Sequence, residues 1–147
     1  MMTENYAQDY IDDLYEEGEF DITSLSFLFG AVNFGGTEDE DCLNKTDVQC
    51  LQDAFILINY LISSGDFEIG KFTPPQDEEK EGPPSRDDYI FKPYENIELL
   101  KKVVISLYEK EGFNAEPFHS EIWLKKKSLG KKSPMIPDEI KKLFRPA

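Results

Sequence analysis

The sequence predicts an α+β fold in which about four or five helices pack with a small antiparallel sheet of two or three strands. Residues 46–64 and 94–111 carry apolar side chains at a spacing of three to four, as amphipathic helices do. The first of these helices runs directly into a strand pattern at residues 66–72, and residues 89–91 can pair with that strand. A helix followed at once by a hairpin is typical of a winged-helix-like core.

The chain begins with an acidic helix. Tyr6, Tyr10 and Leu14 follow one another at intervals of four, so they share one face of a helix over residues 4–17 that ends near Gly18. The opposite face carries carboxylates, which are Asp9, Asp12, Asp13, Glu16 and Glu17.

Residues 24–34 form a second apolar stretch, and the sequence leaves its secondary structure open. Asp21 or Thr23 can cap a short helix. In that helix four side chains would turn inward: Leu25, Leu28, Phe29 and Val32. The stretch is also rich in residues that favour strands, so a strand is the alternative.

The helix at residues 46–64 is the element around which the rest is organised. Thr46 and Gln49 fit a capping box at its start, and Gly65 stands where a left-handed residue ends a helix. Its apolar stripe comprises Val48, Leu51, Phe55, Ile58 and Ile62, widened by Ala54, Leu57 and Leu61. A stripe this broad must pack against something on more than one side. In the strand that follows, Phe67 and Ile69 face one way, with Phe72 a third candidate for the same face.

Two acidic segments interrupt these elements. Glu38, Asp39, Glu40 and Asp41 are adjacent carboxylates that repel one another, so they form either a solvated connection or a patch that faces a partner. Residues 73–88 hold four prolines and six acids, among them Asp77, Glu78, Glu79 and Glu81. Prolines prevent regular structure and the charges favour an extended chain, so we expect a mobile loop.

The C-terminal third supplies the remaining elements. In the helix at residues 94–111, four apolar side chains are in phase: Ile97, Leu100, Val104 and Leu107. Residues 121–124 form a last strand in which Trp123 is expected to anchor the core. A basic turn surrounds Gly130 and is interpreted as a solvated loop; its lysines are Lys125, Lys126, Lys127, Lys131 and Lys132. Pro137 begins a short helix through Phe144.

Size and composition indicate one domain over residues 1–147 with a packed core, since 39% of the residues are hydrophobic and 13% aromatic. No run reaches the roughly 18 apolar residues of a membrane helix. The start of the chain is acidic where a signal peptide would be basic, so we expect a cytoplasmic protein. Cys42 and Cys50 are too few for a disulfide framework, and Cys50 is expected to be a buried thiol.

The charge is large and uneven. The net charge is −14, with 24 acids and 5 bases in residues 1–100 but 6 acids and 11 bases in residues 101–147. Such a field repels nucleic acids and anionic membranes and attracts cationic proteins. The simpler alternative is an acidic protein that is soluble because it is charged.

No catalytic, cofactor-binding or metal-binding residues are predicted. His119 is the single histidine, so it cannot form a histidine pair for a metal site, and no motif surrounds it. Gly35 and Gly36 belong to no phosphate-binding pattern, and the acids near Asp39 lack the glycine and the terminal glutamate of a calcium loop. We therefore expect a protein without enzymatic activity.

The order of these elements resembles a family of small bacterial immunity proteins that accompany polymorphic toxins, including contact-dependent growth inhibition systems. In that family a helix ends in a leucine-rich phrase with glycine and isoleucine before a strand, and a later strand with tryptophan precedes a turn of lysine and glycine. Residues 61–71 match the first phrase by pattern; Ile122, Trp123 and Leu124 with Gly130 and Lys131 match the second after an insertion. These are core and turn residues, not a binding motif, and residues 73–88 replace a short connection.

The resemblance and the charge lead to the same expectation, an immunity protein that binds a cognate basic toxin domain and covers its active site. A nuclease is the favoured toxin, because its active surface must attract polyanions. The candidate contact patches are Glu38–Asp41, Asp77–Glu81 and, third, the part of the first helix that carries Asp9, Asp12, Asp13 and Glu16.

Two other functions remain as alternatives, a winged-helix regulator that binds nucleic acid and an acidic adaptor for another basic protein. The charge argues against the regulator, since the helix at residues 46–64 exposes Asp47 and Asp53 with only Lys45 near its start.

Overall fold

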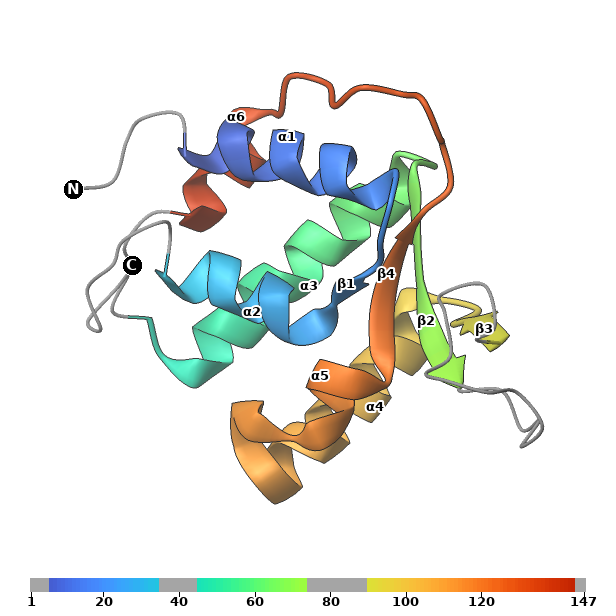
Figure 1. Cartoon of the computed structure of the whole chain (residues 1–147). Coiled ribbons are helices and arrows are strands. Elements are labelled where there is room, and N and C mark those ends of the chain that lie inside the picture. The colour runs from blue at the N-terminus through green and yellow to red at the C-terminus, as the bar shows by residue number, and fades with distance from the viewer. Residues whose placement is uncertain (1–5, 35–44, 74–89, 145–147) are drawn as a thin grey trace.

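The computed structural model describes residues 6–34, 45–73 and 90–144, which form six α-helices and a four-stranded antiparallel sheet (Figure 1). The helices are α1 (Tyr6–Gly18), α2 (Leu25–Phe34), α3 (Asp47–Ser63), α4 (Ile97–Glu111), α5 (Glu116–Ser120) and α6 (Asp138–Lys141), with 3₁₀ turns η2 (Gly112–Asn114) and η3 (Lys142–Phe144). The strands are β1 (Thr23–Ser24), β2 (Phe67–Thr73), β3 (Ile90–Pro93) and β4 (Ile122–Lys126). The predicted α+β class is confirmed, with one helix and one strand beyond the numbers expected.

The strand order in the sheet is β1-β4-β2-β3, so the last strand of the chain lies inside the sheet. Leu124 of β4 stands opposite Thr23 of β1 and also opposite Ile69 of β2. Phe91 of β3 stands opposite Phe72 of β2, which confirms the predicted pairing of these two segments. The helix that runs into a strand hairpin is therefore present as α3, β2 and β3. The predicted mobile loop lies outside the described residues, apart from Thr73 at the end of β2.

Helix α3 begins and ends where the sequence predicts. The Thr46 side chain accepts a hydrogen bond from the backbone N–H of Gln49 at 3.2 Å, which satisfies one of the free donors of the first turn. The helix ends at Ser63, and Gly65 follows with φ of 81°, a conformation that glycine adopts without the steric cost a Cβ would bring.

The second apolar stretch is a helix, which decides between the two structures that the sequence allowed. Only Thr23 and Ser24 are extended, as the edge strand β1, and α2 follows at once. The four side chains expected to turn inward are all buried: Leu25, Leu28, Phe29 and Val32.

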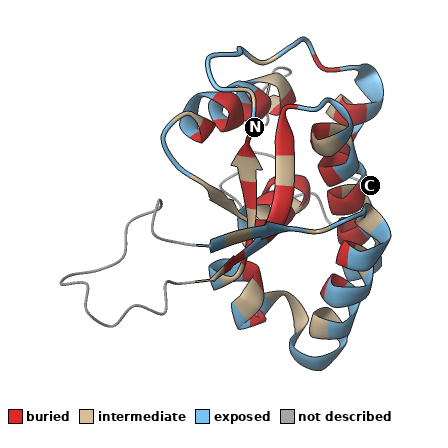
Figure 2. Cartoon of the chain, turned by 90° about the vertical axis from the view of Figure 1, so that its right-hand side faces the viewer, coloured by how far each residue is buried: buried red, intermediate tan, exposed pale blue. Residues whose placement is uncertain are grey.

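The buried side chains form one cluster between the helices and one face of the sheet (Figure 2). Phe118 of α5, a helix the sequence did not reveal, is fully buried and meets the ring of Phe29 at 5.2 Å between centroids. Phe144 closes the other end of the core, where its ring lies 5.8 Å from Tyr6 and 5.5 Å from Tyr10.

Two expectations about which strand side chains enter the core are wrong. Phe72 does not share a face with Phe67, because its ring packs against Phe91 and Trp123 with centroids 4.7 and 6.5 Å away. Trp123 is only half-buried on that same face, and its neighbours Ile122 and Leu124 enter the core instead. Side chains alternate across a strand, so the residues beside the tryptophan face the helices.

Lys45 makes a set of buried contacts that the sequence did not reveal. Its ammonium group donates to the carbonyl of Val32 at 2.6 Å and to that of Leu143, and it lies 2.9 Å from the carboxylate of Asp53. The cation therefore joins the end of α2, the start of α3 and the C-terminal turn η3. A buried ammonium is stable only with such partners.

Gly70 is the residue at which a side chain would disrupt the sheet. A Cβ there would lie 2.4 Å from the carbonyl oxygen of Lys92 and 2.7 Å from the Cα of Pro93, both backbone atoms of β3. We predict that Gly70→Ala lowers the free energy of unfolding by about 1–3 kcal/mol in urea denaturation, because β3 must move away. The exposed neighbour offers a control: Lys71→Ala should change that free energy by less than about 0.5 kcal/mol.

Candidate protein-binding surface

The acidic face of α1 is the predicted contact patch that the structure describes. Its carboxylates are exposed at Asp9, Asp12, Asp13, Glu16 and Glu17. Asp12 also accepts hydrogen bonds from Ser133 and, at 2.9 Å, from Gln8. These two bonds lower the pKa of the Asp12 carboxyl.

The other two predicted patches lie outside the described residues. These are Glu38, Asp39, Glu40 and Asp41, and Asp77, Glu78, Glu79 and Glu81. The role of these two segments as contact patches therefore stays a prediction.

A basic segment of the chain runs beside α1 and offsets part of its charge. Between β4 and α6 the chain passes over α1 (Figure 1), where Gln8 donates to the carbonyl of Pro134 and accepts from the N–H of Ile136, both at 2.9 Å. Lys131 and Lys132 on this segment line a shallow pocket together with Asp12 and Glu16 of α1. Helix α1 is consequently a mixed surface and not a purely acidic one.

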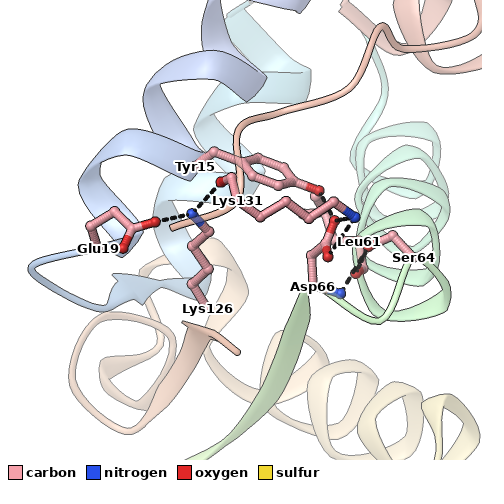
Figure 3. Close-up of polar contacts among 7 residues, drawn as sticks. All are labelled: Tyr15, Glu19, Leu61, Ser64, Asp66, Lys126 and Lys131. Carbon is pink, nitrogen blue, oxygen red and sulfur yellow. Dashed lines mark hydrogen bonds and ion pairs between the residues drawn. The ribbon is translucent and has the colours of Figure 1, made fainter. Parts of the chain in front are cut away.

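The basic turn was expected to be solvated, and this expectation is wrong for one of its five lysines, Lys126. The side chain of Lys126 is 1% exposed; its ammonium group pairs with Glu19 and donates to the carbonyl of Lys131 at 2.7 Å (Figure 3). Glu19 also accepts from the N–H of Gly130 at 2.7 Å. Gly18 permits this approach, since a Cβ there would lie 2.9 Å from the Cβ of Lys126.

Asp66, the residue before β2, forms a second set of charged contacts beside the first. We call the two sets together the ionic cluster; its side chains are Tyr15, Glu19, Asp66, Lys126 and Lys131. The Asp66 carboxylate accepts from the hydroxyl of Tyr15 at 2.6 Å and from the ammonium group of Lys131 at 2.9 and 3.0 Å (Figure 3). Burial acts to raise the pKa of this carboxyl, but hydrogen bonds from Tyr15 and Lys131 outweigh that effect and hold the pKa below its ordinary value. Burial and the bond to Asp66 raise the pKa of Tyr15.

The ionic cluster holds the fold together and offers no reactive group. Each carboxylate in it is bonded to a cation and to a further donor, so α1, β2 and β4 are joined at one corner. Among the described residues, no three His, Cys, Asp or Glu side chains are arranged to hold a metal ion. His119 is exposed on α5, and Cys50 is buried with its thiol directed at the carbonyl of Phe29.

A groove between α3 and α4 is lined by exposed apolar side chains from both helices. Val48 and Ile56 of α3 are 62% and 48% exposed, and Ile105 of α4 is 42% exposed. Leu51 and Phe55 form its buried floor. The groove has a volume of about 860 Å³. The groove is therefore a candidate binding surface.

The sequence contained the signal for this groove, but its interpretation was partly wrong. Val48 was assigned to the core stripe of α3, whereas the structure leaves it in the open groove. The stripe is broad enough to pack on more than one side, as expected, yet the chain covers only part of it. The uncovered part was missed because periodicity shows which helix face is apolar and not what lies against it.

The charged groups around the groove are mainly acidic. At one end the hydroxyl of Tyr108 donates to Asp47, and Glu109 lies beside it; at the other end lies Glu98. Among the described residues that line the groove, Lys101 is the one lysine. Its ammonium group lies 3.7 Å from Glu98 and 5.7 Å from the ring centre of Phe55. The net character of the groove border is therefore negative.

Helix α3 lacks the chemistry of a recognition helix for nucleic acid. No lysine or arginine occurs from Asp47 to Ser63, and its exposed positions carry acidic, apolar, amide or hydroxyl side chains. Lys45, the cation nearest its start, is buried by its three partners and is not available to a phosphate. Phosphate contacts supply most of the affinity for nucleic acids, so these observations do not favour the regulator.

Comparisons with protein-family models, with curated proteins and with solved structures found no match for this chain. Within the described ranges, each helix is too short or too polar to traverse a lipid bilayer.

The low pKa of Asp66 predicts a specific loss of stability in acid. We expect Asp66→Asn to lower the free energy of unfolding at pH 7 by about 1–3 kcal/mol, since the bonds to a charged acceptor are weakened. A carboxyl whose pKa falls on folding stabilises above its unfolded pKa of about 3.9, and this contribution disappears as the pH falls through the folded pKa. Urea denaturation should therefore show the two proteins converging below about pH 4. Asp13→Asn, at an exposed position of α1, should leave the free energy of unfolding nearly unchanged both at pH 7 and below about pH 4.

Burial raises the pKa of the Cys50 thiol to about 11, so we predict that the folded protein resists alkylation. At pH 8 a thiol with that pKa is about one-thousandth thiolate, and the thiolate is the form that reacts. In a Cys42→Ser background, iodoacetamide should label the native chain at least about a hundredfold more slowly than the urea-unfolded chain. Equal rates would show that the site opens freely.

Proposed function

We propose that this protein is an immunity protein, which binds a cognate cationic toxin domain and blocks it. The observation that carries the proposal is the exposed apolar groove between α3 and α4, whose charged border is mainly acidic, on a chain with a net charge of −14. The resemblance of the sequence pattern to bacterial immunity proteins supports the same function.

The groove and the charge have different physical roles in this proposal. Apolar side chains that leave water on binding provide residence time, and a few well-packed ones carry most of the affinity of an interface. Carboxylates act at longer range, since they steer a cationic partner and can raise association rates toward about 10⁸–10⁹ M⁻¹s⁻¹ at low salt.

A nuclease is the toxin class that this chemistry suits best. A nuclease must attract a polyanion, so its active surface is cationic, and carboxylates can occupy the positions of phosphates there. Asp47 and Glu109 at the groove are the carboxylates proposed for this contact, whereas the exposed acids Asp9, Asp13 and Glu17 on α1 add to the long-range field. An acidic adaptor for another basic protein would use the same surface, and the experiment below separates the two.

The test is co-expression with the C-terminal domain of a toxin encoded beside the gene. We predict that the chain restores growth to cells producing that domain, and that the two purified proteins form a complex. Its association rate should fall by about tenfold or more from low to physiological salt, because exposed charges are screened.

Two results would refute this proposal. The first is continued killing by the neighbouring toxin domain in cells that contain the soluble chain. The second is a complex whose association rate does not change with salt, which would exclude acidic steering. Binding to a basic host protein without protection from any toxin would favour the adaptor.

A further inference from the structure

We infer that the groove between α3 and α4 binds an amphipathic α-helix of the partner, apolar along its middle and basic near both ends. This inference deepens the proposed function, on which the identity of the partner as a toxin rests. The shape and the chemistry of the groove are separate observations that support it.

The walls of the groove are two helices that run in opposite directions. Tyr108, near the end of α4, bonds to Asp47 at the start of α3, whereas Lys101 in the second turn of α4 reaches Phe55 at the middle of α3. Along α3 the lining positions Val48, Gln52 and Ile56 are spaced by four. Along α4 the same spacing holds for Ile97, Lys101 and Ile105. Rows at this spacing form the ridges between which the side chains of a further helix pack.

The length of the groove sets the length of its occupant. Lining residues extend from Val48 to Asn59 on α3, which at 1.5 Å per residue is about 16 Å of helix. A partner helix of about three turns would fill this length. Anchors at positions i, i+3 or i+4, and i+7 of that helix would then reach the groove between its two walls.

The positions of polar and apolar side chains in the groove determine which residue types we expect along the partner helix. The middle of the groove is apolar, with Phe55 at its floor and Ile56 and Ile105 on its sides. Carboxylates stand at the ends, with Asp47 and Glu109 at one and Glu98 at the other. Lys101 is already engaged by Glu98 and by the ring of Phe55. A helix with Lys or Arg in its first and last turns complements these ends.

The same charges disfavour two other occupants. A second copy of the chain seated face to face would bring carboxylates at the ends of its own groove toward Asp47, Glu98 and Glu109, between two molecules that each carry −14. An anionic membrane surface is repelled for the same reason. A cationic helix is attracted both by the carboxylates at the ends of the groove and by the negative net charge of the molecule.

The experiment uses the full chain and a displayed library of 14-residue helical peptides with all residue types at each position. We expect the enriched peptides to carry net positive charge and to repeat apolar residues at i, i+3 or i+4, and i+7. Synthetic copies of these peptides, measured by fluorescence anisotropy, should bind Ile56→Asp and Ile105→Asp at least about tenfold more weakly than the unchanged protein.

A matched control lies outside the groove. Leu129 is 65% exposed on the basic segment, so Leu129→Asp introduces the same charge with no expected change in peptide affinity. Each variant must show the circular dichroism spectrum and the urea midpoint of a folded protein. Because Ile105 is surface-exposed, a second variant, Ile105→Ser, removes the apolar anchor without adding a charge and should weaken binding in the same direction.

Several outcomes would overturn the inference. These are a library that yields no ligand, enriched peptides that are acidic or lack the helical repeat, and ligands that bind the groove variants as tightly as the unchanged protein. A dimer in sedimentation that Ile105→Asp dissociates would identify a second copy as the occupant. Adsorption to vesicles of anionic lipid that Ile56→Asp abolishes would identify a membrane.

Failure of this inference can be distinguished from failure of the proposed function. If the toxin domain binds and is neutralised equally by the chain and by its groove variants, the immunity function stands and the groove is not its contact. If basic helices bind the groove while no toxin is neutralised, the groove inference stands and the immunity function falls.

Discussion

The placement of β4 is the constraint on which the rest of the structure depends. This strand pairs with β1 on one side and β2 on the other, so the sheet is continuous only after residues 122–126 have entered it. Entry directs Ile122 and Leu124 into the core and brings the ammonium group of Lys126 beneath α1. A buried cation is costly without a partner, and Glu19 supplies one at the end of that helix. Lys131, five residues on, reaches Asp66, which also accepts from Tyr15, so the same strand also orients the turn and the segment that covers α1.

The groove exists because α3 and α4 bury only part of their apolar surfaces in the core. Ala54, Leu57, Ile58 and Leu61 of α3 are fully buried by the sheet and by the neighbouring helices. Helix α4 contributes Leu100 and Val104 to the same core, while the side chains of Lys101 and Tyr108 extend between the two helices. The flank of α3 that carries Val48 and Ile56 is left in water. Leaving apolar surface exposed opposes stability, and for this reason we propose this flank as the contact with a partner.

Three groups of charged residues lie in different parts of the described structure: exposed acids on α1, acids at the ends of the groove, and buried charged residues bonded within the fold. The described acids on α1 are partly offset by the lysines beside them, so their contribution is to the long-range field more than to a close contact. The groove combines an apolar middle with acids at its ends, which is the chemistry that the proposed cationic helix would complement. The buried polar groups, Lys45, Lys126 and Asp66, are bonded within the fold and are not part of this surface.

The sequence by itself determined the elements that depend on local contacts. The cap at Thr46, the left-handed Gly65, the helical spacing of α4 and the pairing of β2 with β3 all follow from residues near one another in the chain. Only the tertiary structure decided that β4 lies between β1 and β2, that Lys126 is buried, that Phe72 and Trp123 pack on the face opposite the core, and that Val48 lines an open groove. The physical reason is that periodicity places a side chain on a face of its own element, whereas burial and charge pairing depend on which distant segment comes to lie against that face.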